Sequence, residues 1–255
     1  MSFGLKNGKD YIFYFPPSEL SSEMKEISES DRSILEMINQ KIAGGQSLDE
    51  IMNFLFENST SPCDRLGLSF LEDNGLRVTA HWSRAKYDKI ILQKGFWQAL
   101  QGSTLGRILS TGEVRVINDL ESYLEENPKS VSTKLVLKEG VMSSMTCPLK
   151  IDGRPVGFLF RSSLMKNAYD ARHVAMHAII AERISQAVEK AYRIEQLSEM
   201  NRAYTEMLAF VSHEIKNPIS SIIMDSNILL DGYLGNLSKE QSDKIRKLEM
   251  KARFL

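Results

Sequence analysis

The residues best suited to chemistry lie together in one short segment late in the sequence. His213 is followed directly by Glu214 and, four residues after the histidine, by Asn217 and then Pro218. An imidazole beside a carboxylate can be activated for proton or group transfer. Apolar residues recur through this segment at intervals of three and four, which predicts an amphipathic helix (Leu208, Val211, Ile215, Ile219, Ile222). Because His213 lies off that apolar stripe, we expect its ring to face solvent.

This segment, FVSHEIKNPISSI at positions 210–222, resembles the phosphoacceptor box of two-component sensor histidine kinases. The pattern of that box is His-Glu, two residues, Thr or Asn, then Pro, and every fixed position is present. The resemblance implies that His213 accepts a phosphoryl group, that Glu214 is the general base, and that Asn217 orients water for dephosphorylation. It also implies ATP and Mg²⁺, bound by a kinase ATP-binding domain, and a response regulator receiver domain as partner.

The ATP-binding domain of these kinases has no recognisable counterpart in the 255 residues. The glycines at Gly44, Gly45, Gly232 and Gly235 break helices and do not form a phosphate-binding loop. Phosphoryl transfer needs a positioned nucleotide and Mg²⁺. We therefore expect these residues not to phosphorylate themselves and to be a fragment of a longer kinase. Two alternatives stay open: a non-enzymatic ligand-binding dimerisation protein, and a phosphotransfer intermediate.

A different pattern precedes the helical region. Alternating runs at 66–70 and 76–82 meet at Asn74-Gly75, and two further runs at 142–151 and 155–162 meet at Asp152-Gly153. Each arrangement predicts a β-hairpin. Between the hairpins the patterns predict helices at 105–109 and 130–138 and a short strand at 114–117. The result is an α+β fold, an antiparallel sheet with flanking helices.

Several segments of this region resemble the GAF domain, a small-molecule sensor fold. They are residues 106–112 leading to 116–119, and residues 138–144 followed by Cys147-Pro-Leu149 and then 153–157. The resemblance covers roughly residues 30–190 and leaves the ligand unknown. His81 and Trp82 end a predicted strand and are candidates to contact a ligand, with core packing as the alternative. Cys147 is expected to pack as a small hydrophobic residue.

The chain thus divides into four expected parts: an irregular segment 1–29, a GAF sensor domain 30–168, a signalling coiled-coil helix 169–205, and a dimerisation and phosphoacceptor domain 206–255. Near-heptad spacing from His173 onward predicts a parallel coiled coil between two copies. A long helix packed on its own GAF domain is the alternative. The two helices around Gly232 carry narrow apolar stripes, which a homodimeric four-helix bundle would bury.

Composition excludes several other classes of protein. A net charge of −1 with 25% charged residues indicates no nucleic-acid partner. No apolar run reaches the roughly 18–20 residues of a membrane span, and the first residues lack a signal-peptide pattern. Cys63 and Cys147 have neither metal-ligand spacing nor a disulfide framework, so we expect a cytoplasmic protein. His173 and His177 have a zinc-compatible spacing without a third ligand, so no metal is expected.

Overall fold

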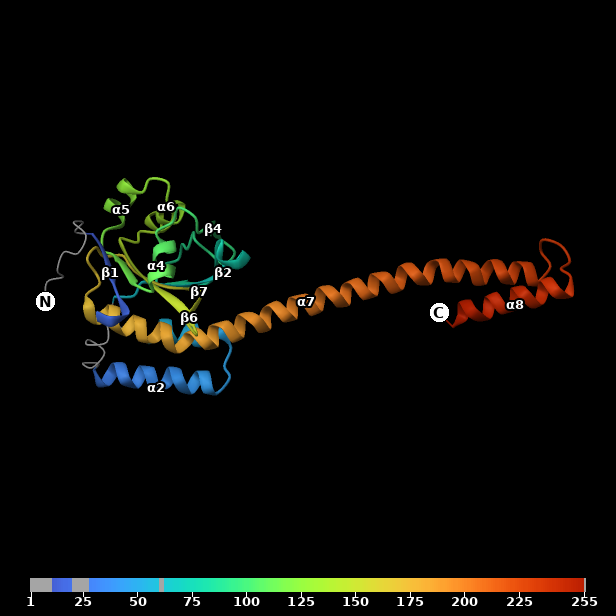
Figure 1. Ribbon diagram of the computed structural model, residues 1–255, viewed down its shortest axis with the longest axis horizontal. Coiled ribbons are helices and arrows are strands. Elements are labelled where there is room, and N and C mark those ends of the chain that lie inside the picture. The colour runs from blue at the N-terminus through green and yellow to red at the C-terminus, as the bar shows by residue number, and fades with distance from the viewer. Residues whose placement is uncertain (1–10, 20–27, 60–61, 255) are drawn as a thin grey trace. The chain divides into compact units, whose positions relative to one another are not determined.

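The computed structural model describes residues 11–19, 28–59 and 62–254. It divides into two compact units, residues 1–192 and 193–255, and each unit is described by itself. The first unit is built on a seven-stranded antiparallel sheet with strand order β1-β5-β6-β7-β2-β3-β4 (Figure 1). The predicted α+β fold with an antiparallel sheet and flanking helices is confirmed.

The elements follow one another with short connections. The strands are β1 (Ile12–Phe15), β2 (Arg65–Glu72), β3 (Arg77–Ala85), β4 (Trp97–Ala99), β5 (Val114–Ile117), β6 (Ser143–Ile151) and β7 (Arg154–Ser163). The helices are α2 (Glu29–Ala43), α3 (Leu48–Glu57), α4 (Leu105–Thr111), α5 (Leu120–Glu126), α6 (Val131–Lys138), α7 (Ala171–Leu230) and α8 (Lys239–Arg253).

Both predicted hairpins form where the turn residues place them. Asn74 and Gly75 have φ angles of 56° and 85°, and Asp152 and Gly153 have φ angles of 49° and 77°. Glycine, asparagine and aspartate reach this left-handed region at least cost, so these sequences favour tight reversals. The hairpins β2–β3 and β6–β7 then join through antiparallel pairing of β2 with β7 and form the centre of the sheet.

Helices cover both faces of the sheet, with α2 and the start of α7 on one side and α4, α5 and α6 on the other (Figure 1). The first side holds the main apolar core. Alternate strand residues such as Leu66, Cys147 and Leu159 pack there against α2, α3 and the part of α7 that includes Ile180 and Ile184. The other side holds two smaller apolar clusters, one around Ile108 and one around Tyr123.

The structure differs from the sequence expectations at the start of this unit. The segment 1–29 was expected to be irregular, but Ile12–Phe15 forms β1, which pairs antiparallel with β5 at the sheet edge. Residues 1–10 and 20–27 lie outside the described part. Helix α2 is capped by Ser28, whose side chain accepts a hydrogen bond from the backbone N–H of Asp31. Asp31 is buried one turn further on, where it pairs with Arg172 of α7 at 3.0 Å.

The end of the first unit also lies later than expected. The expected GAF boundary was residue 168, whereas the compact unit continues to Tyr192. The reason is that Val174, Ile180, Ile184 and Val188 of α7 are buried in the core under the sheet. The first half of the near-heptad stripe therefore packs against its own domain, as the alternative proposed.

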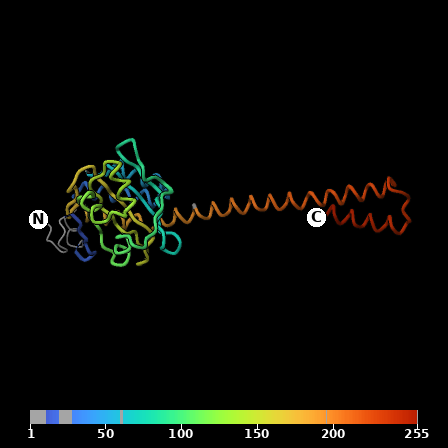
Figure 2. Tube along the Cα trace, turned by 90° about the horizontal axis from the view of Figure 1, so that it is seen from above, coloured from blue at the N-terminus to red at the C-terminus, as the bar shows by residue number. Residues whose placement is uncertain are grey.

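The second unit is a helical hairpin made of the end of α7 and α8, which runs back beside it (Figures 1 and 2). Ser238 and Gln241 form a capping box at the start of α8. Many apolar side chains of this unit stay exposed, among them Leu197, Tyr204, Leu208, Ile215 and Leu248. Pro218 lies inside α7, which continues without interruption to Leu230. No described helix is both long enough and apolar enough for a membrane span.

Candidate functional site

Small and hydroxyl-bearing residues on the second face of the sheet make room for a cavity. On β2, Gly67 and Ser69 line it, while the alternating Leu66 and Phe70 belong to the core on the opposite face. On β6, Ser144 lines the cavity and the neighbouring Met145 packs in that core. Because successive strand residues point to opposite faces, this alternation builds an apolar core on one side and leaves room for a pocket with polar groups on the other.

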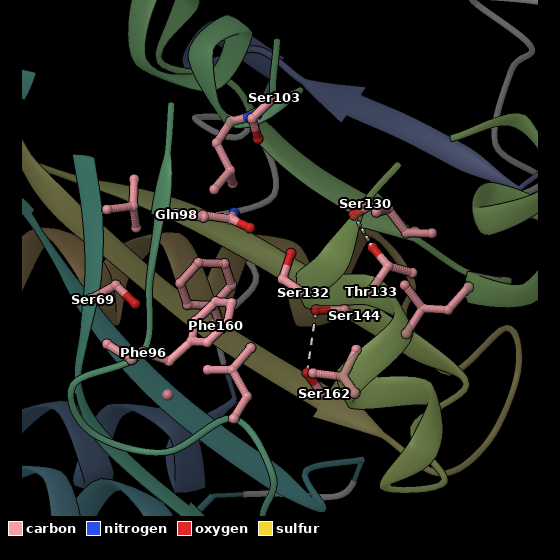
Figure 3. Close-up of a pocket in the computed structure, with 18 of the residues that line it drawn as sticks. Ser69, Phe96, Gln98, Ser103, Ser130, Ser132, Thr133, Ser144, Phe160 and Ser162 are labelled. Atoms are coloured by element: carbon pink, nitrogen blue, oxygen red, sulfur yellow. Dashed lines mark hydrogen bonds between the residues drawn. The ribbon is translucent and has the colours of Figure 1, made fainter. Parts of the chain in front are cut away.

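The cavity has a volume of about 100 Å³, several times what one water molecule requires. Aromatic rings of Phe96 and Phe160 lie on one side, and hydroxyl groups face them from the other (Figure 3). The hydroxyl-bearing residues on that second side are Ser130, Ser132, Thr133, Ser144 and Ser162. Ser130 bonds Thr133 at 2.7 Å and Ser162 bonds Ser144 at 3.2 Å. The cavity can therefore hold a small molecule with one apolar and one polar side.

Two arginines, Arg65 and Arg115, line the cavity, and only the first is paired with a carboxylate. Arg65 Nε lies 3.2 Å from a fully buried Glu139 carboxylate oxygen. Glu139 also accepts hydrogen bonds from the Tyr87 hydroxyl and from the backbone N–H groups of Ile91 and Leu92, each at 2.6–2.7 Å. This ion pair holds the β3–β4 connection against the sheet, and Leu92 of that connection lines the cavity.

Arg115 of β5 is buried, with 7% of its surface exposed. Its Nη1 donates to the Thr104 hydroxyl and its Nη2 to the Thr146 hydroxyl at 3.0 Å. Its Nε has no hydrogen-bond partner. Burial lowers the pKa of the guanidinium from its usual value, although arginine keeps its proton in proteins. No carboxylate in the described part of the chain pairs with Arg115.

Of the two residues predicted to contact a ligand, Trp82 lines the cavity and His81 does not. The His81 ring packs at 4.5 Å from Phe70 and at 5.0 Å from Tyr192, measured between ring centroids. His81 Nε2 lies 3.4 Å from Glu72. A β-bulge between β2 and β3 leaves His81 without a partner in the strand register, because Leu68 pairs with Trp82 and Ser69 with Ala80.

The cluster around Glu72 ties the β2–β3 hairpin to α7. Partial burial opposes ionisation of this carboxyl, but hydrogen bonds from Thr79, Arg77 and His81 outweigh it and lower the pKa of Glu72 to about 2. The Tyr192 hydroxyl also donates to Glu72 at 3.3 Å. Tyr192 is the last residue of the first unit. The carboxylate therefore anchors the end of that unit to the sheet.

Cys147 is fully buried in the main core, where burial raises the pKa of its thiol. His173 pairs with Asp170 at 2.7 Å, and the His177 ring lies under the sheet, 3.4 Å from the Leu159 carbonyl oxygen. Within the described residues, no three His, Cys, Asp or Glu side chains are grouped as a metal site requires.

The predicted phosphoacceptor residues lie together on α7 in the second unit. The His213 side chain is 70% exposed, and its Nδ1 lies 3.5 Å from a Glu214 carboxylate oxygen. The Asn217 amide nitrogen lies 3.4 Å from the same Nδ1. Among the described residues, nothing hydrogen-bonds His213 Nε2. This nitrogen is open to an incoming group.

Sequence reasoning missed Arg115. Its signal was present: it is the one charged residue within the strand Val114–Ile117, whose other members are apolar and buried. A charge in a strand buried on both faces must have a partner, a ligand or a cost in stability. The sequence also indicates that one face of β6 carries hydroxyl groups, because Ser144 and Thr146 alternate with Met145 and Cys147.

The GAF domain profile matches residues 45–189, which is more than half of the chain, so the protein belongs to the GAF domain family. Members of this family serve as sensory, ligand-binding domains in many signalling proteins.

Solved GAF domains share the fold at low sequence identity. A phycocyanobilin-bound GAF domain from a cyanobacterial phytochrome is 14% identical, with a TM-score of 0.52, over 65% of this chain and 97% of that one. The GAF domain of a phosphoenolpyruvate-protein phosphotransferase from Coxiella burnetii is also 14% identical, with a TM-score of 0.52, over 66% and 99% of the two chains. A comparison with curated protein sequences gave no match.

Proposed function

We propose that this chain is the sensory and phosphoacceptor part of a two-component histidine kinase. In this proposal the GAF cavity binds a small ligand, and His213 receives a phosphoryl group and passes it to an aspartate of a response regulator. The observation that carries the proposal is the exposed His213 ring, with Glu214 and Asn217 beside its Nδ1, on the helix that begins in the GAF core.

The Glu214 contact of Nδ1 suits nucleophilic attack by Nε2, whereas a hydrogen bond from the Asn217 amide to Nδ1 would require the other tautomer. When Glu214 accepts a hydrogen bond from Nδ1–H, the imidazole is held in the tautomer whose Nε2 carries the lone pair. Nε2 then forms a bond to the γ-phosphorus of ATP while the bond to the leaving ADP oxygen breaks. The developing imidazolium charge is relieved as the Nδ1 proton moves to Glu214. ATP and Mg²⁺ would be bound by a separate kinase ATP-binding domain.

Asn217 suits a different step. It lies one helical turn after His213, and its amide can orient a water molecule toward the phosphoryl group of the regulator. Because an amide neither attacks phosphorus nor takes up the imidazole proton, its loss should impair dephosphorylation more than phosphorylation.

A test needs the complete chain mixed with a kinase ATP-binding domain and ATP, with acid-labile phosphate as the readout. His213→Gln should abolish labelling, because a glutamine amide is not a nucleophile. Glu214→Gln should slow labelling by roughly 10²–10⁴-fold, the usual loss when a general base is removed. Asn217→Ala should label normally and fail to dephosphorylate the regulator.

His173→Gln is a matched control, because His173 also lies on α7 beside a carboxylate but belongs to the first unit. It should label like the wild type. Labelling of His213→Gln at the wild-type rate would overturn the proposal. Labelling of His213 from a phosphorylated regulator, with none from ATP, would favour the phosphotransfer intermediate instead.

A further inference from the structure

We propose that the GAF cavity binds a small organic anion with an apolar body, and that the Arg115 guanidinium neutralises the charge of this ligand. This inference names the ligand class of the sensor proposed above and rests on that sensory role. It is carried by the charge balance of the cavity wall.

The charge of Arg115 is left uncompensated inside the fold. No Asp or Glu is among the cavity-lining residues of the described chain. The titratable groups that act on Arg115 are the phenols of Tyr123 and Tyr14, and neither is a carboxylate. A buried cation without a counter-ion lowers the stability of a fold, and a ligand that supplies the negative charge would offset this cost.

The guanidinium also keeps hydrogen-bond donors available. It has five N–H groups in a fixed fork that matches a carboxylate or a phosphate. Thr104 and Thr146 each accept one bond, so two of the four N–H groups on Nη1 and Nη2 keep no partner among the described residues, whereas Nε is buried without one. The two hydroxyl contacts hold the fork in place without cancelling its charge. The site is therefore preorganised for an anion.

Arg65 provides an internal comparison. It lines the same cavity but is paired with Glu139 and donates to the Leu92 carbonyl at 2.8 Å. Arg65, which holds the cavity wall, is thus paired with a buried carboxylate, whereas Arg115 is paired with no carboxylate of the described residues. The net charge contributed by the two arginines and Glu139 is +1.

The rest of the wall defines the body of the ligand. The rings of Phe96 and Phe160 on one side suit an apolar or aromatic group, and the hydroxyls of Ser132 and Thr133 on the other can bond further ligand oxygens (Figure 3). The volume of about 100 Å³ favours a compact molecule. Small carboxylates and phosphates share this chemistry.

The test measures binding of acetate, succinate, benzoate and inorganic phosphate to the complete chain by calorimetry, with benzamide as the neutral analogue of benzoate. We expect at least one of these anions to bind, and benzoate to bind better than benzamide. Arg115→Met should weaken anion binding by about 10-fold to 100-fold, the value of hydrogen bonds to a charged partner. Arg115→Lys should retain part of it, and Arg154→Gln, at an exposed residue that begins β7 and does not line the cavity, should change nothing.

Thermal unfolding separates a binding role from a structural one. The unligated Arg115→Met variant should unfold at the same temperature as the wild type or higher, because a buried charge has been removed. The proposal is overturned if none of the four anions binds better than the neutral analogue, or if Arg115→Met binds them as the wild type does. The binding experiment contains no ATP and no kinase domain, so a negative result would not contradict the phosphoacceptor role of His213. In the same way, a failure to label His213 would not contradict anion binding by the cavity.

Discussion

At the scale of single residues, His177 shows how burial sets the pH behaviour of the fold. Its ring is 1% exposed and lies under the sheet. Burial, with a smaller contribution from the charge of Arg161, lowers the pKa of His177 to about 3 from an ordinary value of 6.5. The imidazole therefore stays neutral in the folded protein at pH values where it would be charged in the unfolded chain.

The direction of the pH effect follows from this difference. The unfolded chain binds one more proton than the folded protein between pH 6.5 and 3. The contribution to stability is thus present above pH 6.5 and is lost as the pH falls, at up to about 1.4 kcal/mol per pH unit. Urea unfolding at pH 7.5 and pH 5 should show a smaller loss for His177→Leu than for the wild type. The same loss in both proteins would contradict this account, and His173→Gln is the control.

At the scale of elements, the pairing of β2 with β7 at the centre of the sheet depends on Gly157. Strands β2 and β7 approach so closely there that a Cβ on Gly157 would lie 2.1 Å from the Ser69 carbonyl oxygen. The obstacle is backbone, which cannot rotate away as a side chain could. The cavity residues Ser69 and Phe160 lie on these two strands, so the pairing of β2 with β7 also positions the cavity wall.

Gly157→Ala should therefore destabilise the first unit by at least about 2 kcal/mol through overpacking. Thermal unfolding followed by circular dichroism would measure the change. Gly106→Ala in α4 is a matched control, because the space around that position is open to 4.0 Å and alanine favours helix. An unchanged melting temperature for Gly157→Ala would show that the two strands can separate without cost.

At the scale of the whole molecule, the exposed apolar stripe of the second unit leads to a prediction about assembly. Leu208 is 48% exposed and Leu248 is 58% exposed, and both lie on stripes with helical spacing. A second copy of the chain would cover these side chains in a four-helix bundle, as the proposed phosphoacceptor domain requires. Assembly of the molecule is therefore expected to depend on residues 193–255.

Sedimentation at micromolar concentration should show a dimer for the wild type. Leu208→Lys and Ile245→Lys should give monomers, because placing an unpaired charge in a bundle costs roughly several kcal/mol. Glu206→Lys, on the opposite side of α7 from Leu208, should remain dimeric. A monomeric wild type would refute the bundle.

Much of the local structure could be predicted because its causes are local. Asn74-Gly75 and Asp152-Gly153 favour reversals through their own backbone preferences, and Ser47 with Glu50 forms the capping box that its spacing predicts. The strand β1 could not be predicted in this way. It exists because Ile12 pairs with Ile117, more than a hundred positions away, and nothing in its own four residues encodes that partner.

The sequence by itself determined the hairpins, the capping boxes, the alternation that separates the two faces of the sheet, and the order His213, Glu214, Asn217 on a helix. Only the tertiary structure decided which surface each apolar stripe packs against and which group pairs with each buried charge. The stripe through Ile180 and Ile184 suits a coiled coil and a sheet equally, and the contacts assign it to the sheet. Arg65 and Arg115 look alike in sequence, and the fold brings a carboxylate to the first one alone, because ion pairing depends on residues that are distant along the chain.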